Sequence, residues 1–556
     1  MRDSVQSSEQ FQGFERQDAR LGSAHLVVAF TALLIGGICG LLQALDQGGM
    51  VNMPSWIGYY QLLTAHGVLL ALVTTTFFII GFIYAGLARV LGGKLIPATR
   101  RYGWIGFVLM TVGTIMATVM ILANKATVLY TFYAPMQASP WFYIGLALLV
   151  VGSWSSGIGV FLNYRHYRHT HPGKTSPLLS FMAVATFIMW FVASIGVAIE
   201  VVVQLIPWSF GWVETVNVLL SRTLFWFFGH PLVYFWLLPA YMIWYVCLPK
   251  IVGGKIFSDA LARLAFVLFI MFSIPVGFHH QLTEPGVAQG WKFLQVSLTM
   301  AVVVPSLMTA FSMFATFESV GRAKGARGLF GWLKVLPWND VRFLAPFIAM
   351  LLFIPGGAGG IINASNQMNQ VVHNTMFITG HFHLAVATTV LLTFFGAAYW
   401  LIPALTNRRL TPAINKLGIV QTILWTVGML IMSGAMHIVG LLGAPRRTSF
   451  TDYQGSAVAA DWVPYKIAMG VGGAILFVAI ILMVYIVIHL FLFAPKGKTD
   501  FVVSEVAEGA QKTPMWLEHW PVWVGLIATL ILIAYVSPVI HIIEQSPPGS
   551  LPFVTW

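Results

Sequence analysis

The sequence predicts an all-α, polytopic membrane protein with about thirteen transmembrane helices. Of the 556 residues, 58% are hydrophobic and only 9% are charged, whereas an average soluble domain contains about 25% charged residues. Apolar stretches of roughly 20 residues, the length that crosses a bilayer as a helix, recur along the whole chain. Lys and Arg gather in alternate connections between these stretches, which is the pattern that orients helices in a membrane.

Thirteen apolar stretches are long enough to span the hydrocarbon layer. They are residues 24–46, 57–88, 104–124, 141–162, 178–206, 219–248, 264–281, 294–320, 343–364, 374–404, 417–442, 467–494 and 519–543. Pro and Gly occur inside several of them, which bilayer helices tolerate.

The spans form one transmembrane domain, 24–543, between an N-terminal tail, 1–23, and a C-terminal tail, 544–556. The longest connections, 321–342 and 495–518, are too short to hold a separate soluble domain. We find no convincing sequence repeat, which argues against the inverted-repeat architecture of many transporters. The first 23 residues are polar and a full span follows them, so we expect no cleaved signal peptide.

The net charge of +12 is a topology signal and does not indicate a nucleic-acid partner. Of the 30 Lys and Arg residues, 24 lie in the N-terminal tail or in the even-numbered connections. The opposite connections hold Lys125, Lys292, Arg446 and Arg447, and Arg222 and Lys466 lie near span ends. Since positive charge marks the cytoplasmic side, we expect a cytoplasmic N-terminus and an external C-terminus.

Cysteine usage excludes several kinds of metal site. Both cysteines, Cys39 and Cys247, lie in apolar runs. The chain therefore has no disulfide framework, no CxxC zinc site and no CxxCH motif for covalent haem attachment.

Six histidines within the spans are candidate metal ligands. They are His66 in TAHGVLL, His230 in GHPLVY, His279 and His280 in GFHHQ, and His381 and His383 in GHFHL. The predicted topology places all six in the outer half of the membrane; His66, for example, lies about 14 Å below the outer surface at 1.5 Å per residue. One such histidine is usually a helix–helix contact, but six at one depth favour a metal site. Neutral imidazoles suit iron and copper, and few carboxylates argue against Mg²⁺ or Ca²⁺.

Spacing separates these histidines into groups. His381 and His383 are two residues apart, so a helix points them about 200° apart, toward two different centres. The adjacent His279 and His280 diverge by about 100° on a regular helix, but the preceding Pro275 permits a distortion that lets both reach one ion.

Hydroxyl groups form two stripes below the proposed metal site. On one span Tyr234 shares a helical face with His230, four residues away, and Tyr241 and Tyr245 continue the stripe toward the cytoplasm. Ser306, Thr309 and Ser312 descend another span at intervals of three, and Ser258 lies in the cytoplasmic connection. The stripes predict a proton route, although serine and threonine also bond back to their own helix.

These motifs together resemble subunit 1 of the haem–copper oxidases, over nearly all of the chain. The segments that carry the resemblance are LTAHGVL, NKATVLYTFY, GHPLVYFWLLPAY, PVGFHHQ, VPSLMTAF, FIPGGAGG, VVHNTMFITGHFH and APRR. Within that superfamily the chain looks like the B-type branch, the ba-type cytochrome c oxidases of thermophilic bacteria. Leu232 agrees with this branch, because the common A-type oxidases carry a glutamate at that position.

The resemblance implies a role for each histidine. His66 and His383 would be the axial ligands of a low-spin haem, of the b type, and His381 the proximal ligand of a high-spin haem, of the a type. One copper ion would be held by His230, His279 and His280. Tyr234 would be cross-linked to His230 and would supply an electron and a proton for breaking the O–O bond.

The resemblance also implies how the haems are held and how protons arrive. Four residues would contact the haem propionates: Arg446, Arg447, His373 and Asn369. A K-type proton pathway would use Tyr241, Tyr245, Ser258, Ser306, Thr309 and Ser312. Asn369 stands where we expect Asp, which puts an acid-dependent proton-loading role in doubt, and Ser312 stands where we expect Thr.

The function implied is that of a terminal respiratory oxidase, a proton-translocating cytochrome c oxidase in a bacterial or archaeal cell membrane. It would reduce O₂ to water, coupled to proton uptake and pumping. Its partners would be a subunit 2 with a dinuclear copper centre, cytochrome c, and a small single-helix subunit. Two alternatives are a nitric oxide reductase of the same superfamily, which Tyr234 and Leu232 argue against, and quinol as electron donor. A transporter without metals would leave the six histidines unexplained.

Overall fold

The computed structural model describes residues 13–449, 453–504, 513–545 and 549–556. Parts of both predicted tails, 1–12 and 546–548, lie outside the described residues. The described chain folds into helices, with four isolated β-bridges and no strand. The predicted all-α class is confirmed.

Within the described residues, twelve helical spans are long and apolar enough to cross a membrane. They are α1 (Arg16–Gln47); α2, η1 and α3 (Tyr59–Gly67, Val68–Thr74, Thr75–Val90); α4 (Pro97–Leu122); α5 (Pro140–Thr170); α6, η2 and α7 (Leu178–Ile199, Glu200–Leu205, Ile206–Ser209); α8 and α9 (Val218–Val246, Leu248–Val252); α11 and α12 (Gln289–Ala301, Val303–Ala323); α13 (Val341–Ala364); α15, η5 and α16 (Met376–Phe382, His383–Val390, Leu391–Thr406); α17 (Pro412–Leu441); α18, α19 and η6 (Ala457–Ala460, Val463–Ile488, His489–Phe493); and α20, η9 and α21 (Trp520–Ile531, Leu532–Val536, Ser537–Gln545). Shorter elements are α10 (Asp259–Ser273), α14 (Asn366–Val372), and the 3₁₀ turns η3 (Gly277–Gln281), η4 (Gly331–Val335) and η8 (Met515–Glu518).

The seventh predicted span, 264–281, is interrupted, which explains why twelve long helices replace about thirteen. Helix α10 has 15 residues and ends at Ser273, just before Pro275. Proline cannot donate a backbone hydrogen bond and clashes with the preceding turn, so the α-helix stops there. The chain continues as the 3₁₀ turn η3, which carries two of the candidate ligands.

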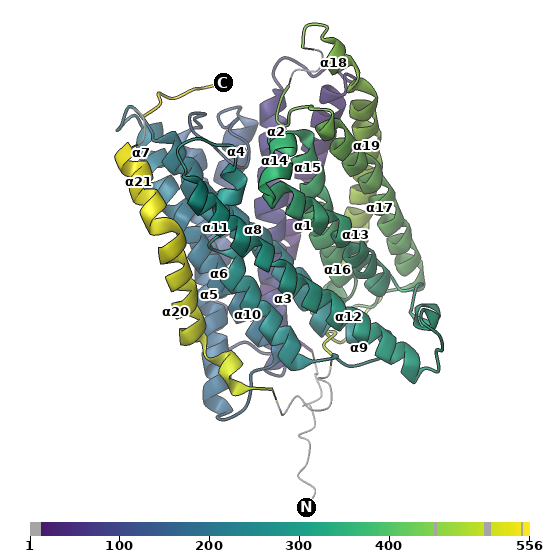
Figure 1. Ribbon diagram of the computed structural model, residues 1–556. Helices are drawn as coiled ribbons and strands as arrows, with labels where there is room; N and C mark the ends of the chain where they lie inside the picture. Colours follow the sequence, from purple (N-terminus) through teal and green to yellow (C-terminus); the bar gives the residue numbers. More distant parts are fainter. Residues whose placement is uncertain (1–12, 450–452, 505–512, 546–548) are drawn as a thin grey trace, which may run out of the picture.

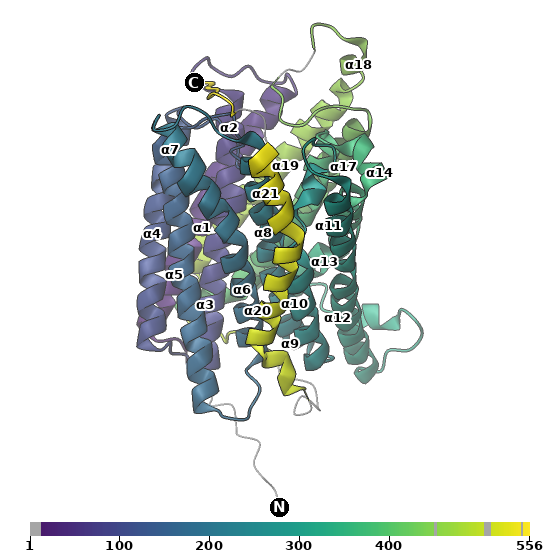
Figure 2. The ribbon, with the colours of Figure 1, turned by 60° about the vertical axis from the view of Figure 1, so that its left-hand side comes forward.

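The helices run roughly side by side in one bundle (Figure 1). Its upper end in Figure 1 carries α14, α18 and the C-terminal residues 549–556, and its lower end carries α9 and the end of α12. The last span, α20 to α21, lies on the outside of the bundle and crosses in front of α8 and α10 in Figure 2.

Helix α4 shows why this bundle belongs in a bilayer. One face packs against α5 through glycines so closely that a Cβ on Gly113 would lie 2.3 Å from the Gly145 carbonyl oxygen. The opposite face carries the exposed apolar side chains Val108, Val112, Ile115 and Val119. Small residues between helices and apolar residues outside are typical of membrane helices. We therefore treat the chain as a multi-pass membrane protein.

Candidate haem and copper site

A cavity of about 530 Å³ lies inside the bundle and is lined by all six candidate histidines. Other candidate residues line the same cavity: Tyr234, Ser306, Asn369, His373, Arg446 and Arg447. The remaining lining is mostly apolar, as expected for a site that holds a large planar ligand. Residues from six predicted spans therefore meet around a single chamber.

Three histidines form a compact group with the spacing of a metal site. One imidazole nitrogen from each of His230, His279 and His280 lies within 4.8 Å of the other two. The Nδ1 atom of His230 is 3.2 Å from Nε2 of His280. Outside this group, His279 is oriented by Thr299, whose Oγ1 is 2.9 Å from Nδ1, and His280 stacks on Trp226 at 3.7 Å. Such outer contacts fix ring orientation in metal sites.

The fold explains how adjacent histidines reach one point. On the tight 3₁₀ turn η3 the rings of His279 and His280 lie 4.1 Å apart, at 39° to each other. Helix α8 supplies His230 from the opposite wall. Three neutral imidazoles with no carboxylate among them fit a copper ion.

Tyr234 lies beside this group, one turn along α8 from His230. The two ring centroids are 5.1 Å apart. The Nε2 atom of His230 is buried and has no hydrogen-bond partner within the described part of the chain. A buried polar atom without a partner is uncommon and calls for a ligand or a bond.

His66 and His383 face each other across another part of the cavity. Their rings are tilted by only 13° and their centroids are 6.2 Å apart. The Nδ1 atom of His66 lies 3.0 Å from the Gly36 carbonyl oxygen, and Nδ1 of His383 lies 2.8 Å from the Thr379 carbonyl oxygen. The Nε2 atom of each ring is therefore available to bind a metal ion. Because imidazole–metal bonds are roughly 2 Å long, the gap accommodates one metal ion between the rings.

His381 points to a different element from His383. Its Nδ1 lies 2.7 Å from the Gly356 carbonyl oxygen on α13. A Cβ on Gly359 would lie 3.0 Å from this ring, and a Cβ on Gly360 would lie 3.2 Å from it. The glycines of α13 therefore make room for the His381 imidazole, whereas the His383 imidazole faces His66 on α2.

Arg446 and Arg447 place positive charge at the upper end of the cavity. The pKa of Arg446 is lowered to about 10 by burial and by the neighbouring Arg447. The Nε atom of Arg446 is buried and has no hydrogen-bond partner among the residues that the structure describes, and Arg447 lies over the Tyr133 ring at 5.1 Å. Neither guanidinium forms an ion pair with a described residue. Two adjacent, partly buried cations fit an anionic ligand, since an unpaired charge shielded from water is costly.

His373 and Asn369 form a pair beside these arginines. Nδ1 of His373 lies 3.0 Å from Oδ1 of Asn369, whose Nδ2 donates to the Asn363 carbonyl oxygen at 2.6 Å. The pKa of His373 is lowered to about 4 by burial and by the charge of Arg446. The imidazole is therefore neutral near pH 7.

A hydrogen bond joins the two hydroxyl stripes. Tyr245 on α8 donates to Thr309 on α12 at 3.1 Å. The hydroxyls of Ser306 and Thr309 also donate to carbonyl oxygens of their own helix. The Ser312 hydroxyl is buried and has no partner among the described residues. Ser258 caps α10 by accepting a hydrogen bond from the Leu261 N–H, at 3.2 Å.

Several contacts of this site could not be identified as functional from the sequence. Thr299 and Trp226 orient His279 and His280, but nothing in their sequence context distinguishes them from other apolar-span residues. The tyrosines under Arg447 lie in NKATVLYTFY, and the glycines beside His381 lie in FIPGGAGG. Those two segments contribute to the family resemblance, but the resemblance assigns no role to these tyrosines and glycines.

The comparisons with known proteins agree with one another. A sequence model of the family "Cytochrome C and Quinol oxidase polypeptide I" matches residues 20–475. Cytochrome c oxidase subunit 1 of Thermus thermophilus is 41% identical over 540 residues, which cover 94% of each chain. Quinol oxidase subunit 1 of Bacillus subtilis is 24% identical over 456 residues, 77% of this chain and 65% of the relative.

A solved structure shares the fold. A haem–copper terminal oxidase dimer, determined by cryo-electron microscopy, superposes with a TM-score of 0.90 at 34% identity. The match covers 97% of this chain and 95% of the other. The chain therefore belongs to the family of cytochrome c and quinol oxidase subunit 1, the catalytic subunits of the haem–copper terminal oxidases.

Proposed function

We propose that this chain is the catalytic subunit of a B-type cytochrome c oxidase, which reduces O₂ to water and couples the reaction to proton uptake and pumping. The observation that carries the proposal is the division of six histidines in one cavity into a facing pair, a single ligand and a cluster of three. Leu232, where A-type enzymes have a glutamate, supports the B-type assignment.

Each cofactor has a set of residues that fits it. His66 and His383 would hold a low-spin haem, which we assign to the b type. His381 would hold a high-spin haem of the a type, and His230, His279 and His280 would hold copper. The orphan Nε2 of His230 and the parallel rings of the facing pair support this assignment. When bound, the haems and copper supply electrons to O₂.

Tyr234 would be the proton and electron donor of this chain at the site. Its phenol is the nearest hydroxyl along α8 to His230, and the i, i+4 spacing favours a covalent cross-link between the two side chains. The apolar surroundings exclude bulk water, so the proton must come along a defined route.

That route would run along Tyr241, Tyr245, Ser306, Thr309 and Ser312 from an entrance near Ser258. The Tyr245–Thr309 hydrogen bond supports a connection between α8 and α12. The unpartnered Ser312 hydroxyl supports an ordered water below it, because buried polar atoms are usually satisfied by water when protein offers no partner.

The upper end of the cavity would hold the haem propionates. Arg446 and Arg447 supply charge to two carboxylates, and His373 and Asn369 supply neutral contacts beside them. Arginine suits this task because its planar guanidinium binds carboxylates in a bidentate manner.

The remaining assignments follow the charge pattern. Residues 24–543 would form the membrane domain of a bacterial or archaeal plasma membrane protein, with the tail 1–23 in the cytoplasm and the tail 544–556 outside. Electrons would enter from cytochrome c through a subunit 2 with a dinuclear copper centre, and a small single-helix subunit would complete the complex.

One experiment tests the cofactor assignment. Metal analysis combined with a pyridine haemochrome spectrum of the purified complex should give two haems and one copper for this chain, beyond the copper of subunit 2. Two haems with an additional iron and no copper would instead identify a nitric oxide reductase. The steady-state oxidation rates of reduced cytochrome c and of a quinol, measured separately, then decide between the two electron donors.

A further inference from the structure

The last span of the chain is hydrogen-bonded to the turn that carries His279 and His280. The backbone N–H of Gly277 donates to the Tyr535 hydroxyl at 2.8 Å. The next N–H, of Phe278, donates to Oε1 of Gln295 at 2.7 Å. The same Gln295 side chain donates from Nε2 to the Ala534 carbonyl oxygen at 3.0 Å. Two consecutive N–H groups of η3 are thus held by α11 and the last span.

These contacts satisfy backbone N–H groups that the interruption of the span leaves without helical partners. The first N–H groups of a helical turn lack partners within it, and a membrane offers no water to satisfy them. Gly277 fits this arrangement, because a Cβ there would lie 2.5 Å from the Tyr535 hydroxyl oxygen and 2.6 Å from the Trp226 carbonyl oxygen. A larger residue at 277 would push the last span away from the turn.

Packing reinforces the hydrogen bonds. Phe278, the residue before His279, has its ring 5.2 Å from that of Tyr535. Both belong to a small hydrophobic core of their own, made of Phe278, Val287, Ala534, Tyr535 and Ile542. Much of the last span is apolar and exposed on the bundle surface, whereas Ala534 and Tyr535 are buried. The π-helical turn η9 contains both residues, and such turns shift backbone carbonyls out of the regular pattern.

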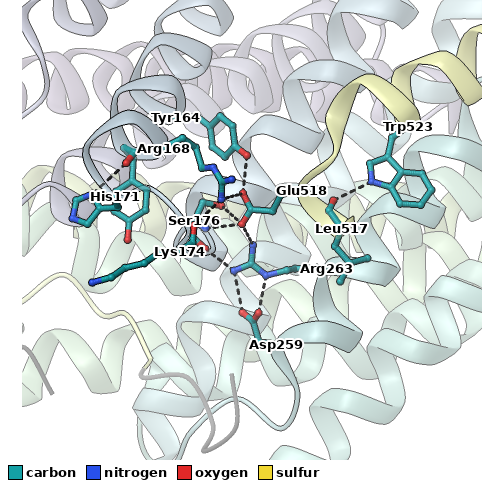
Figure 3. A network of polar contacts seen from close by, with 11 residues as sticks. Tyr164, Arg168, His171, Lys174, Ser176, Asp259, Arg263, Leu517, Glu518 and Trp523 are labelled. Atoms are coloured by element: carbon teal, nitrogen blue, oxygen red, sulfur yellow. Dashed lines mark hydrogen bonds and ion pairs between the residues drawn. The ribbon is translucent and has the colours of Figure 1, made fainter. Parts of the chain in front are cut away.

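The lower end of the last span is fixed by a buried ionic network around Glu518 (Figure 3). One carboxylate oxygen of Glu518 accepts hydrogen bonds from Arg263 at 3.0 Å and from the Ser176 N–H at 2.5 Å. The other accepts from Tyr164 at 2.7 Å and pairs with Arg168 at 3.2 Å. Arg263 lies on α10, and Tyr535 holds η3. Glu518, just before α20, is therefore bonded to α10, and Tyr535, within the last span, is bonded to η3, so this segment contacts both parts of the interrupted span.

We propose that the last span holds the two parts of the interrupted span in place, and we call it a splint for that reason. Tyr535 and Gln295 are then positioning residues that set the placement of His279 and His280. The inference rests on the proposed binding of copper by these histidines. The splint, residues 513–545, lies outside the matched family region, 20–475. Its function would be to keep two adjacent ligands on a turn that the helix itself does not stabilise.

The test compares variants in the purified oxidase complex with haems and copper bound. Tyr535→Phe removes one hydroxyl and keeps the ring, and Gln295→Met removes both amide contacts at similar length. Tyr485→Phe, on the exposed face of α19, is the matched control. The readouts are the infrared stretch of carbon monoxide on copper and the resistance of that copper to a chelator.

We expect both variants to shift or broaden the copper–carbon monoxide band and to weaken copper retention by up to about 10-fold, the lower range for loss of an outer contact at a metal site. Haem content and the control should be unchanged. An unaltered band and unaltered retention in both variants would overturn the splint. Should Tyr535→Phe fail to assemble, the Gln295→Met result decides alone. A parent complex without copper on these histidines would overturn the proposed function instead.

Discussion

The rings of His66 and His383 lie nearly parallel, with centroids 6.2 Å apart, although they belong to spans far apart in sequence. Both Nδ1 atoms are occupied by backbone carbonyl oxygens, so both Nε2 atoms are free to face one metal. A π-helical turn lies at each position: η1 begins two residues after His66, and His383 is the first residue of η5. This near-parallel arrangement of the two rings is the one that a single metal ion with two axial histidine ligands requires.

We therefore predict that His383→Ala loses the low-spin haem and keeps the copper. Removal of one of two axial ligands leaves an apolar gap that cannot hold the iron, whereas the copper ligands lie on other elements. The optical spectrum should lose the low-spin bands, and metal analysis should still find copper. His489→Ala, remote from the cavity, is the control; equal loss of both metals in His383→Ala would indicate general misfolding.

Tyr234→Phe should abolish O₂ reduction while both haems remain bound. The substitution removes only the hydroxyl that would supply a proton and an electron, and the ring still fills the space beside His230. Oxygen consumption and the haem spectrum of the same sample check both parts.

Tyr399→Phe offers a buried phenol that does not line the cavity as a comparison. If Tyr234→Phe kept full turnover, its role as donor would be wrong.

The fold could be predicted from the sequence because a bilayer imposes simple rules on length and charge. Apolar length and the alternation of Lys and Arg predicted an all-α membrane bundle, and the structure confirms it. Hydropathy could not locate the break at Ser273, because the residues after it remain apolar. Backbone geometry at Pro275, rather than composition, decides where that helix ends.

The candidate site could be predicted only in part from the sequence, for a similar reason. Helical spacing predicted that His381 and His383 face different elements, since this depends on neighbours in sequence. Partners from distant segments, such as Tyr535 at Gly277 and Thr299 at His279, depend on how helices pack. Those residues carry no motif, so their contacts emerge only from the three-dimensional arrangement.

Thr309→Val should slow proton-coupled turnover by several-fold. Valine keeps the shape but removes the acceptor of the Tyr245 hydrogen bond, a loss of about 1 kcal/mol, and a tenfold rate change corresponds to about 1.4 kcal/mol. Thr309→Ser retains the hydroxyl and should restore the rate. Electron transfer between the haems, followed after flash photolysis, should be equal in all three proteins, so slowing of that step as well would argue against a proton role.

Finally, in the chain without bound haem, His373 should make the fold less stable in acid. Burial and the charge of Arg446 lower its pKa to about 4 in the folded protein, below the value of about 6.5 expected in an unfolded chain. The unfolded state thus binds the proton more readily, so stability is highest above pH 6.5 and falls as the pH decreases from about 6.5 toward 4. Thermal unfolding followed by circular dichroism should show this decline. His373→Asn, which cannot titrate but can still pair with Asn369, should flatten it, and an identical decline in the variant would assign the acid sensitivity to other groups.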